Sequence, residues 1–237
     1  MTEAPVKSPP SRPLTLTVNG TQQVSALLMI PPTARALLVL GHGAGAGMQH
    51  PFMAGVASGL GAQGIATLRY QFPYMEQGRR RVDPPALSHA TVRAAVAAAA
   101  TAAPALPLFA GGKSFGGRMT SQAQADIALP GVRGLVFVGF PLHPAGRPGD
   151  QRAEHLQSVE VPMLFLQGTR DELADLELIR SVTTRLSKRA TLVVIDDADH
   201  SFHVRAKSGR KDAAAMGELL AALAAWVNSQ LDPPSAR

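Results

Sequence analysis

Six short apolar runs recur along this chain, and each is followed by a Gly-rich or polar turn and then by a segment of helix length. Each run is too brief for a helix, which is typical of strands that are buried on both faces. Strands of this kind pair in parallel and are covered by helices. The runs lie at residues 36–40, 66–69, 106–110, 135–138, 163–167 and 192–195.

The other elements complete a mostly parallel α/β fold. Asn19-Gly20 favours a type I′ turn, so the apolar runs at 14–18 and 24–29 predict an antiparallel hairpin at its start. Two irregular stretches, 71–87 and 139–161, follow strands and should lie over the carboxyl edge of the sheet, where open α/β folds bind ligands. Neither is long enough for a full lid domain. Helices are expected at 51–62, 88–102, 115–127, 173–186 and 213–230.

The domain organisation follows from length and composition. A chain of 237 residues fits one α/β domain, and no repeat or change in composition marks a second. We therefore expect a flexible Pro-rich segment at residues 1–13 and a single domain at 14–237. The sequence does not indicate the oligomeric state.

Composition also excludes several classes of protein. The absence of cysteine excludes disulfides, thiolate metal sites and cysteine catalysis, and is compatible with a cytoplasmic location. The first residues lack the apolar core of a signal peptide, and no run approaches the roughly 20 apolar residues of a membrane span. The net charge is +6, but aromatic residues make up 5% of the chain, too few for platforms that stack bases. We expect a cytoplasmic protein that binds neither nucleic acid nor membrane.

Two motifs overlap in the segment LPLFAGGKSFGGRM, residues 106–119. Gly112-Lys113-Ser114 has the form of the end of a phosphate-binding P-loop, but Pro107, which has no N–H, stands where the first glycine is required. Gly112, Ser114 and Gly116 match instead the nucleophile elbow of serine hydrolases, a strained turn between a strand and a helix. The motif is weak evidence in a Gly-rich chain, and its strand–turn–helix context carries most of the weight.

Later turns supply an acid and a base in the order serine, acid, histidine that this fold requires. Asp171 follows the run at 163–167 and is the expected acid, with capping of the next helix as its simpler role. Asp175 lies further into that helix. His200 follows the last strand and is the expected base, with His203 as the alternative.

Acyl transfer also needs backbone N–H donors where negative charge develops on the carbonyl oxygen. Phe115, directly after the serine, is one expected donor. The second should come from the Gly-rich loop after 36–40, with Ala44 as the first candidate and Gly45 as the next. Met48 stands where a dinucleotide-binding fingerprint would require its last glycine, and His42 is expected to form structural hydrogen bonds.

Six segments together resemble a known family: GHGAGAGMQHPFM, LRYQFPYMEQGRRRVDPP, GGKSFGGRM, FVGFPLHPAGRP, FLQGTRDEL and DADHSF. From about Ala36 to its end the chain resembles the dienelactone-hydrolase-like branch of the α/β-hydrolases. More narrowly, it is similar to the testis-expressed hydrolase-like family and the hydrolase-like subunit of the NSL chromatin complex. The resemblance implies an α/β-hydrolase fold with Ser114 as nucleophile, Asp171 as acid and His200 as base. That branch commonly uses a cysteine nucleophile, which this chain lacks, so dienelactone itself is not implied as the substrate.

The sequence thus predicts a serine hydrolase of an ester, thioester or related acyl bond, acting on a small molecule without a cofactor or metal. The alternative is an inactive binding or scaffold protein with the same fold. Arg79, Arg80 and Arg81 follow the strand at 66–69, and Arg147 lies in the stretch 139–161. They are candidates for binding an anionic acyl group, although a solvent-exposed role is the simpler interpretation.

Overall fold

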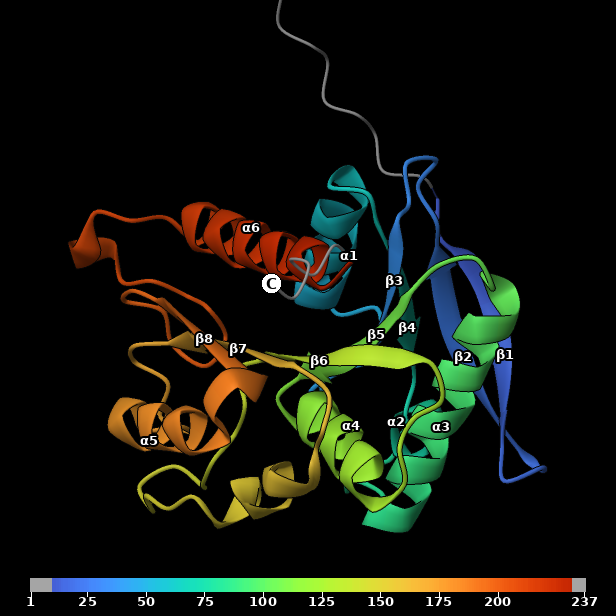
Figure 1. Cartoon of the computed structure of the whole chain (residues 1–237), viewed down its shortest axis with the longest axis horizontal. Coiled ribbons are helices and arrows are strands. Elements are labelled where there is room, and N and C mark those ends of the chain that lie inside the picture. Colours follow the sequence, from blue (N-terminus) through green and yellow to red (C-terminus); the bar gives the residue numbers. More distant parts are fainter. Residues whose placement is uncertain (1–9, 232–237) are drawn as a thin grey trace, which may run out of the picture.

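A computed structural model of the protein describes residues 10–231, in which eight strands form one sheet (Figure 1). Their order across the sheet is β1-β2-β4-β3-β5-β6-β7-β8. β1 and β2 are antiparallel, as are β2 and β4, and all other neighbouring pairs are parallel. The strands are β1 (Arg12–Val18), β2 (Gln22–Met29), β3 (Ala36–Gly41), β4 (Ile65–Tyr70), β5 (Leu108–Lys113), β6 (Val132–Val138), β7 (Met163–Gly168) and β8 (Ala190–Ile195).

The prediction of a mostly parallel sheet opened by an antiparallel hairpin is confirmed. Asn19 and Gly20 have φ of 50° and 76°, and the Thr21 N–H donates to the Val18 carbonyl at 3.2 Å. Two successive residues with positive φ are what a type I′ turn requires, which explains why asparagine and glycine stand there.

Helices cover both faces of the sheet (Figure 1). α1 (Pro51–Ala62) and α6 (Asp212–Leu231) pack on one face, while α3 (Pro85–Ala102), α4 (Phe115–Asp126) and α5 (Leu176–Leu186) pack on the other. Each face has its own apolar core, and the central strands β3 and β4 are buried on both sides. No helix in the described part of the chain is both long and apolar enough to cross a membrane.

Several element boundaries differ from those expected. β5 begins at Leu108, two residues later than predicted, and extends to Lys113, immediately before Ser114. The helix expected from 173 begins at Leu176, because the Asp175 carboxylate accepts from the Glu177 and Leu178 N–H groups and caps it.

The expected irregular stretches contain short helical elements and no inserted lid among residues 10–231: α2 (Pro73–Glu76) in the first and η1 (Gln151–Ser158) in the second. Two further 3₁₀ turns, η2 (Ser187–Arg189) and η3 (Ala206–Ser208), flank β8 and its loop. Of the segment 1–13 predicted to be flexible, residues 1–9 lie outside the described residues, and β1 already begins at Arg12.

Candidate active site

Ser114 occupies the turn between β5 and α4 at the carboxyl edge of the sheet. Its φ of 49° and ψ of −112° are strained for a residue with a side chain. The Ser114 N–H donates to the Val138 carbonyl at 3.1 Å, which anchors the turn to the neighbouring strand. The strained conformation is the one that a nucleophile elbow imposes.

The glycines on either side of Ser114 are required by close backbone packing. A Cβ atom on Gly112 would lie 2.8 Å from the Gly116 carbonyl carbon and would also meet the Gly41 carbonyl oxygen. A Cβ atom on Gly116 would lie 2.8 Å from the His42 carbonyl oxygen. These contacts are with backbone atoms, which cannot move aside, so any side chain at either position would disrupt the turn.

His200 and Asp171 come to Ser114 from two other loops. His200 Nε2 lies 2.9 Å from Ser114 Oγ, and His200 Nδ1 lies 2.7 Å from Asp171 Oδ2. The Asp171 side chain is fully buried, while 22% of the His200 side chain is exposed. The three residues expected from the sequence therefore form one continuous chain of hydrogen bonds that ends at the serine.

The Asp171 carboxylate is oriented by further donors. Its Oδ2 accepts from the Gln167 side-chain amide, and its Oδ1 accepts from the Leu173 N–H at 2.8 Å. Gln167 is buried in β7 and also accepts from the Phe140 N–H at 3.1 Å. Gln167 is not among the residues predicted from the sequence, where its only signal is a polar residue at the end of an apolar strand. The helix-capping role belongs to Asp175.

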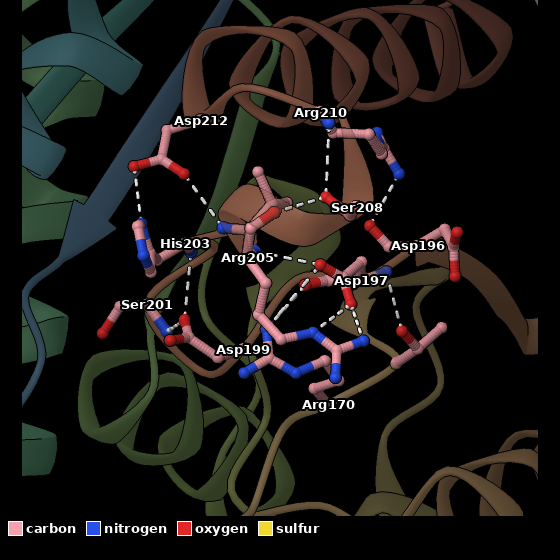
Figure 2. A network of polar contacts seen from close by, with 12 residues as sticks. Arg170, Asp196, Asp197, Asp199, Ser201, His203, Arg205, Ser208, Arg210 and Asp212 are labelled. Atoms are coloured by element: carbon pink, nitrogen blue, oxygen red, sulfur yellow. Dashed lines mark hydrogen bonds and ion pairs between the residues drawn. The ribbon is translucent and has the colours of Figure 1, made fainter.

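The loop that carries His200 is held by a polar network (Figure 2). Asp197, with φ of 54°, accepts hydrogen bonds from the backbone and guanidinium of Arg205 across the loop. Arg170, the residue before the acid, donates to the Asp197 carbonyl at 3.0 Å. This contact ties the loop of the acid to the loop of the base.

His203, the alternative base, points out of the same loop (Figure 2). Its Nδ1 lies 2.7 Å from Asp212 Oδ2 at the start of α6, and both side chains are exposed. That hydrogen bond raises the pKa of His203. His200, not His203, is the histidine hydrogen-bonded to Ser114.

A cavity of about 340 Å³ opens onto the serine. Its wall combines Ser114, His200 and Lys113 with apolar side chains and with the loop after β3. Ala44 belongs to this wall, whereas Gly45, with φ of 75°, does not. The lining residues are Gly43, Ala44, Ala46, His50, Phe52, Met53, Lys113, Ser114, Leu173, His200 and Ser201.

Phe115, the other expected donor, is buried as the first residue of α4, directly after Ser114. Its N–H belongs to the first turn of the helix, where backbone donors lack an intrahelical acceptor. His42 is buried beneath the loop after β3, where it accepts from the Phe72 N–H at 3.1 Å and donates to the Gly43 carbonyl at 2.8 Å. Burial lowers the pKa of His42 to about 4, so it is neutral and structural.

The arginines that the sequence suggested for substrate binding do not line the cavity. Arg79 pairs with Asp83 at 2.6 Å, and Arg80, Arg81 and Arg147 are exposed. Residues 10–231 contain no group of three His, Asp or Glu side chains placed to hold a metal ion.

A second serine–histidine contact lies away from this cavity. Ser121 Oγ in α4 lies 2.8 Å from His155 Nε2 in η1. Ser121 is buried, donates to the Arg118 carbonyl at 2.9 Å, and does not line the cavity. Burial, together with Arg118 and His89, lowers the pKa of His155 to about 4. No carboxylate among the described residues is hydrogen-bonded to His155, so this pair lacks the third member of a triad.

The fold and the elbow agree with a known protein family. A family model described as an alpha/beta hydrolase domain matches residues 34–228, which run from just before β3 into α6. The chain belongs to the alpha/beta hydrolase family.

Solved structures with the same fold include three bacterial proteins. This alpha/beta hydrolase is 21% identical to dienelactone hydrolase from Anabaena variabilis, with a TM-score of 0.73 over 92% of this chain and 97% of that one. A serine hydrolase without a lid from Xanthomonas campestris is 22% identical, with a TM-score of 0.71 over 94% and 98%. Est1E from Butyrivibrio proteoclasticus, solved with ferulic acid bound, is 17% identical, with a TM-score of 0.68 over 89% and 99%.

Proposed function

We propose that the protein is a serine hydrolase that cleaves a small ester, thioester or related acyl bond. The observation that carries the proposal is the hydrogen-bonded chain Ser114–His200–Asp171, which ends at a cavity. In such a chain the imidazole removes the proton of the hydroxyl, and the carboxylate orients the imidazole and stabilises its cation. The resemblance to known hydrolases supports the fold, and the site supports the chemistry.

The proposed reaction proceeds in two halves. Ser114 Oγ attacks the carbonyl carbon while its proton passes to His200 Nε2, which then protonates the departing alcohol or thiol. Water next attacks the acyl-enzyme, gives its proton to His200, and the proton returns to Ser114 as the acid is released. Asp171 keeps the proton on His200 Nδ1, so that Nε2 is free to accept one at the start of each half.

The negative charge on the carbonyl oxygen requires donors that are already in place. We assign the Phe115 N–H and the Ala44 N–H to this role, because one begins α4 after the nucleophile and the other belongs to the cavity wall. Gly45 is a weaker candidate, since it does not line the cavity.

The names of the structural relatives suggest substrates only for those proteins. Dienelactone hydrolase shares the fold, and Est1E was solved with ferulic acid, a small aromatic acid. By analogy with these two proteins, we propose a small acyl substrate for this chain. The narrower kinship with the testis-expressed hydrolase-like family rests on its sequence motifs alone.

Labelling by a fluorophosphonate probe, followed by peptide mass mapping, tests the proposal directly. We expect modification of Ser114 in the wild type, no labelling of Ser114→Ala, and normal labelling of Ser121→Ala. In the same three proteins, hydrolysis of p-nitrophenyl acetate should fall by several orders of magnitude only in Ser114→Ala. Loss of labelling in Ser121→Ala alone would identify Ser121, and not Ser114, as the nucleophile. An inert wild type would favour a scaffold without turnover.

A further inference from the structure

Lys113, the last residue of β5, stands immediately before the proposed nucleophile and has no role in the proposed reaction. Its aliphatic chain packs toward Gly43 in the loop after β3, where a Cβ atom would lie 3.6 Å from Lys113 Cγ. A Cβ atom on Gly139 would lie 3.1 Å from Lys113 Nζ and 3.4 Å from the His200 ring. The Lys113 ammonium and the His200 ring therefore both lie against Gly139.

The Lys113 ammonium is buried and has no hydrogen-bond partner among the described residues. Its Nζ lies 5.9 Å from the centre of the Phe202 ring. Asp171 and Asp199 are near enough to favour its charge, but both Asp171 oxygens and Asp199 Oδ1 accept from other donors. Asp171 accepts from His200, Gln167 and Leu173, and Asp199 Oδ1 accepts from the N–H groups of Ser201 and His203.

The cavity above Lys113 contains no opposing charge. Of the residues that line it, Lys113 alone is a lysine, arginine, aspartate or glutamate. Burial lowers the pKa of Lys113 to about 8, so that the amine still carries a proton at neutral pH. A buried ammonium without an acceptor is costly, and a ligand that supplies an anionic oxygen recovers part of that cost.

We propose that Lys113 binds a carboxylate on the acyl part of the substrate, which makes the protein a hydrolase of anionic acyl esters. The inference rests on the proposed function, because it assigns the substrate class of that same site. The four-carbon side chain of lysine is flexible enough to turn its ammonium from beside Gly139 toward a carboxylate in the cavity. The exposed arginines at 79–81 and 147 are not needed for this selectivity.

Two substrates of equal chain length test the inference: p-nitrophenyl hexanoate and mono-p-nitrophenyl adipate, which end in a methyl group and a carboxylate. We expect the wild type to prefer the adipate ester in kcat/KM. In Lys113→Met the ratio should fall by roughly tenfold to a hundredfold, the usual worth of a hydrogen bond to a charged group. Competitive inhibition by free adipate should weaken in parallel.

Lys207→Met is the matched control, because Lys207 is exposed in η3 and does not line the cavity. It should keep the wild-type ratio, also at roughly 0.5 M salt, where charges on the surface are screened within a few ångströms. Thermal unfolding of all variants checks that they fold. If Lys113→Met folds poorly, Lys113→Gln removes the charge with a polar side chain and repeats the test.

The outcomes separate the two proposals. The inference would be overturned if both esters are hydrolysed and Lys113→Met and Lys113→Gln leave the ratio of their kcat/KM values unchanged. It would also be overturned if Lys207→Met lowers that ratio equally. In either case the proposed hydrolase function would still stand. Hydrolysis of neither ester, together with an unlabelled Ser114, would instead overturn the proposed function.

Discussion

Gln167 holds two groups in the buried interior, one on each atom of its side-chain amide. It donates to Asp171 Oδ2 and accepts from the Phe140 N–H. We predict that Gln167→Leu leaves the Phe140 N–H unpaired and destabilises the fold by about 1–3 kcal/mol. Because Asp171 is then less firmly oriented, kcat on p-nitrophenyl acetate should fall more than KM changes.

Urea unfolding and steady-state kinetics of Gln167→Leu check that prediction. Gln63→Leu is its control, since Gln63 makes one long side-chain bond, 3.5 Å to the Gly59 carbonyl, and follows α1, a helix that contributes no member of the triad. Wild-type kcat in Gln167→Leu would show that Asp171 needs no support from β7.

Lys113 gives a prediction about pH. Burial lowers its pKa from 10.5 to about 8, so between these values the unfolded chain binds the proton that the folded protein has released. The free energy of unfolding of the wild type should therefore rise with pH across this window, relative to Lys113→Met. The gap between the two proteins should change by about 2–3 kcal/mol between pH 7 and pH 10.5. Parallel denaturant titrations measure it, and a constant gap would contradict the burial of the ammonium.

At the level of elements, α4 can begin directly after Ser114 only because Gly116 lets the helix approach β3. A Cβ atom there would meet the backbone of Gly41 and His42. We predict that Gly116→Ala destabilises the protein by more than about 3 kcal/mol or prevents folding, since backbone atoms cannot yield.

The control is a second glycine in a helix, Gly55 of α1, which is exposed and would have no atom within 4 Å of an added methyl group. Gly55→Ala should stabilise the protein by roughly 0.5–1 kcal/mol, because alanine loses less backbone freedom on folding. Thermal unfolding of the two variants compares the cost of a backbone clash at Gly116 with the gain in helix propensity at Gly55. Equal effects would show that the elbow is not tightly packed.

For the whole molecule, one sheet separates two cores that should unfold together. Trp226, the single tryptophan of the chain, belongs to α6, lies in the core on the face covered by α1 and α6, and packs against Phe109 at 5.8 Å between ring centres. Leu37 is fully buried in the core on the other face. We predict that Leu37→Ala lowers the stability reported by Trp226 fluorescence by about 2–5 kcal/mol.

Urea titrations followed by Trp226 fluorescence and by far-ultraviolet circular dichroism should give coincident midpoints in both proteins. That result would support the single domain expected for residues 14–237. A Trp226 transition unmoved by Leu37→Ala would show instead that the two faces unfold independently.

The order of strands and helices can be predicted from the sequence alone, because buried strands and their turns leave local signals in apolar runs and glycines. Ser114, Asp171 and His200 are also indicated there, since each follows a strand that ends at the same edge of a parallel sheet. The choice between neighbouring residues requires the three-dimensional arrangement: Asp171 rather than Asp175 contacts the base, and His200 rather than His203 contacts the serine.

The same limit explains Gln167, Lys113 and the arginines. A glutamine at the end of a strand and a lysine within a turn have no local pattern that distinguishes burial from exposure. Their roles depend on loops that approach from far along the chain, such as the loop of His200, which lies 86 residues after Ser114. Local chemistry predicts which groups can react, whereas long-range packing decides which groups lose water and face one another.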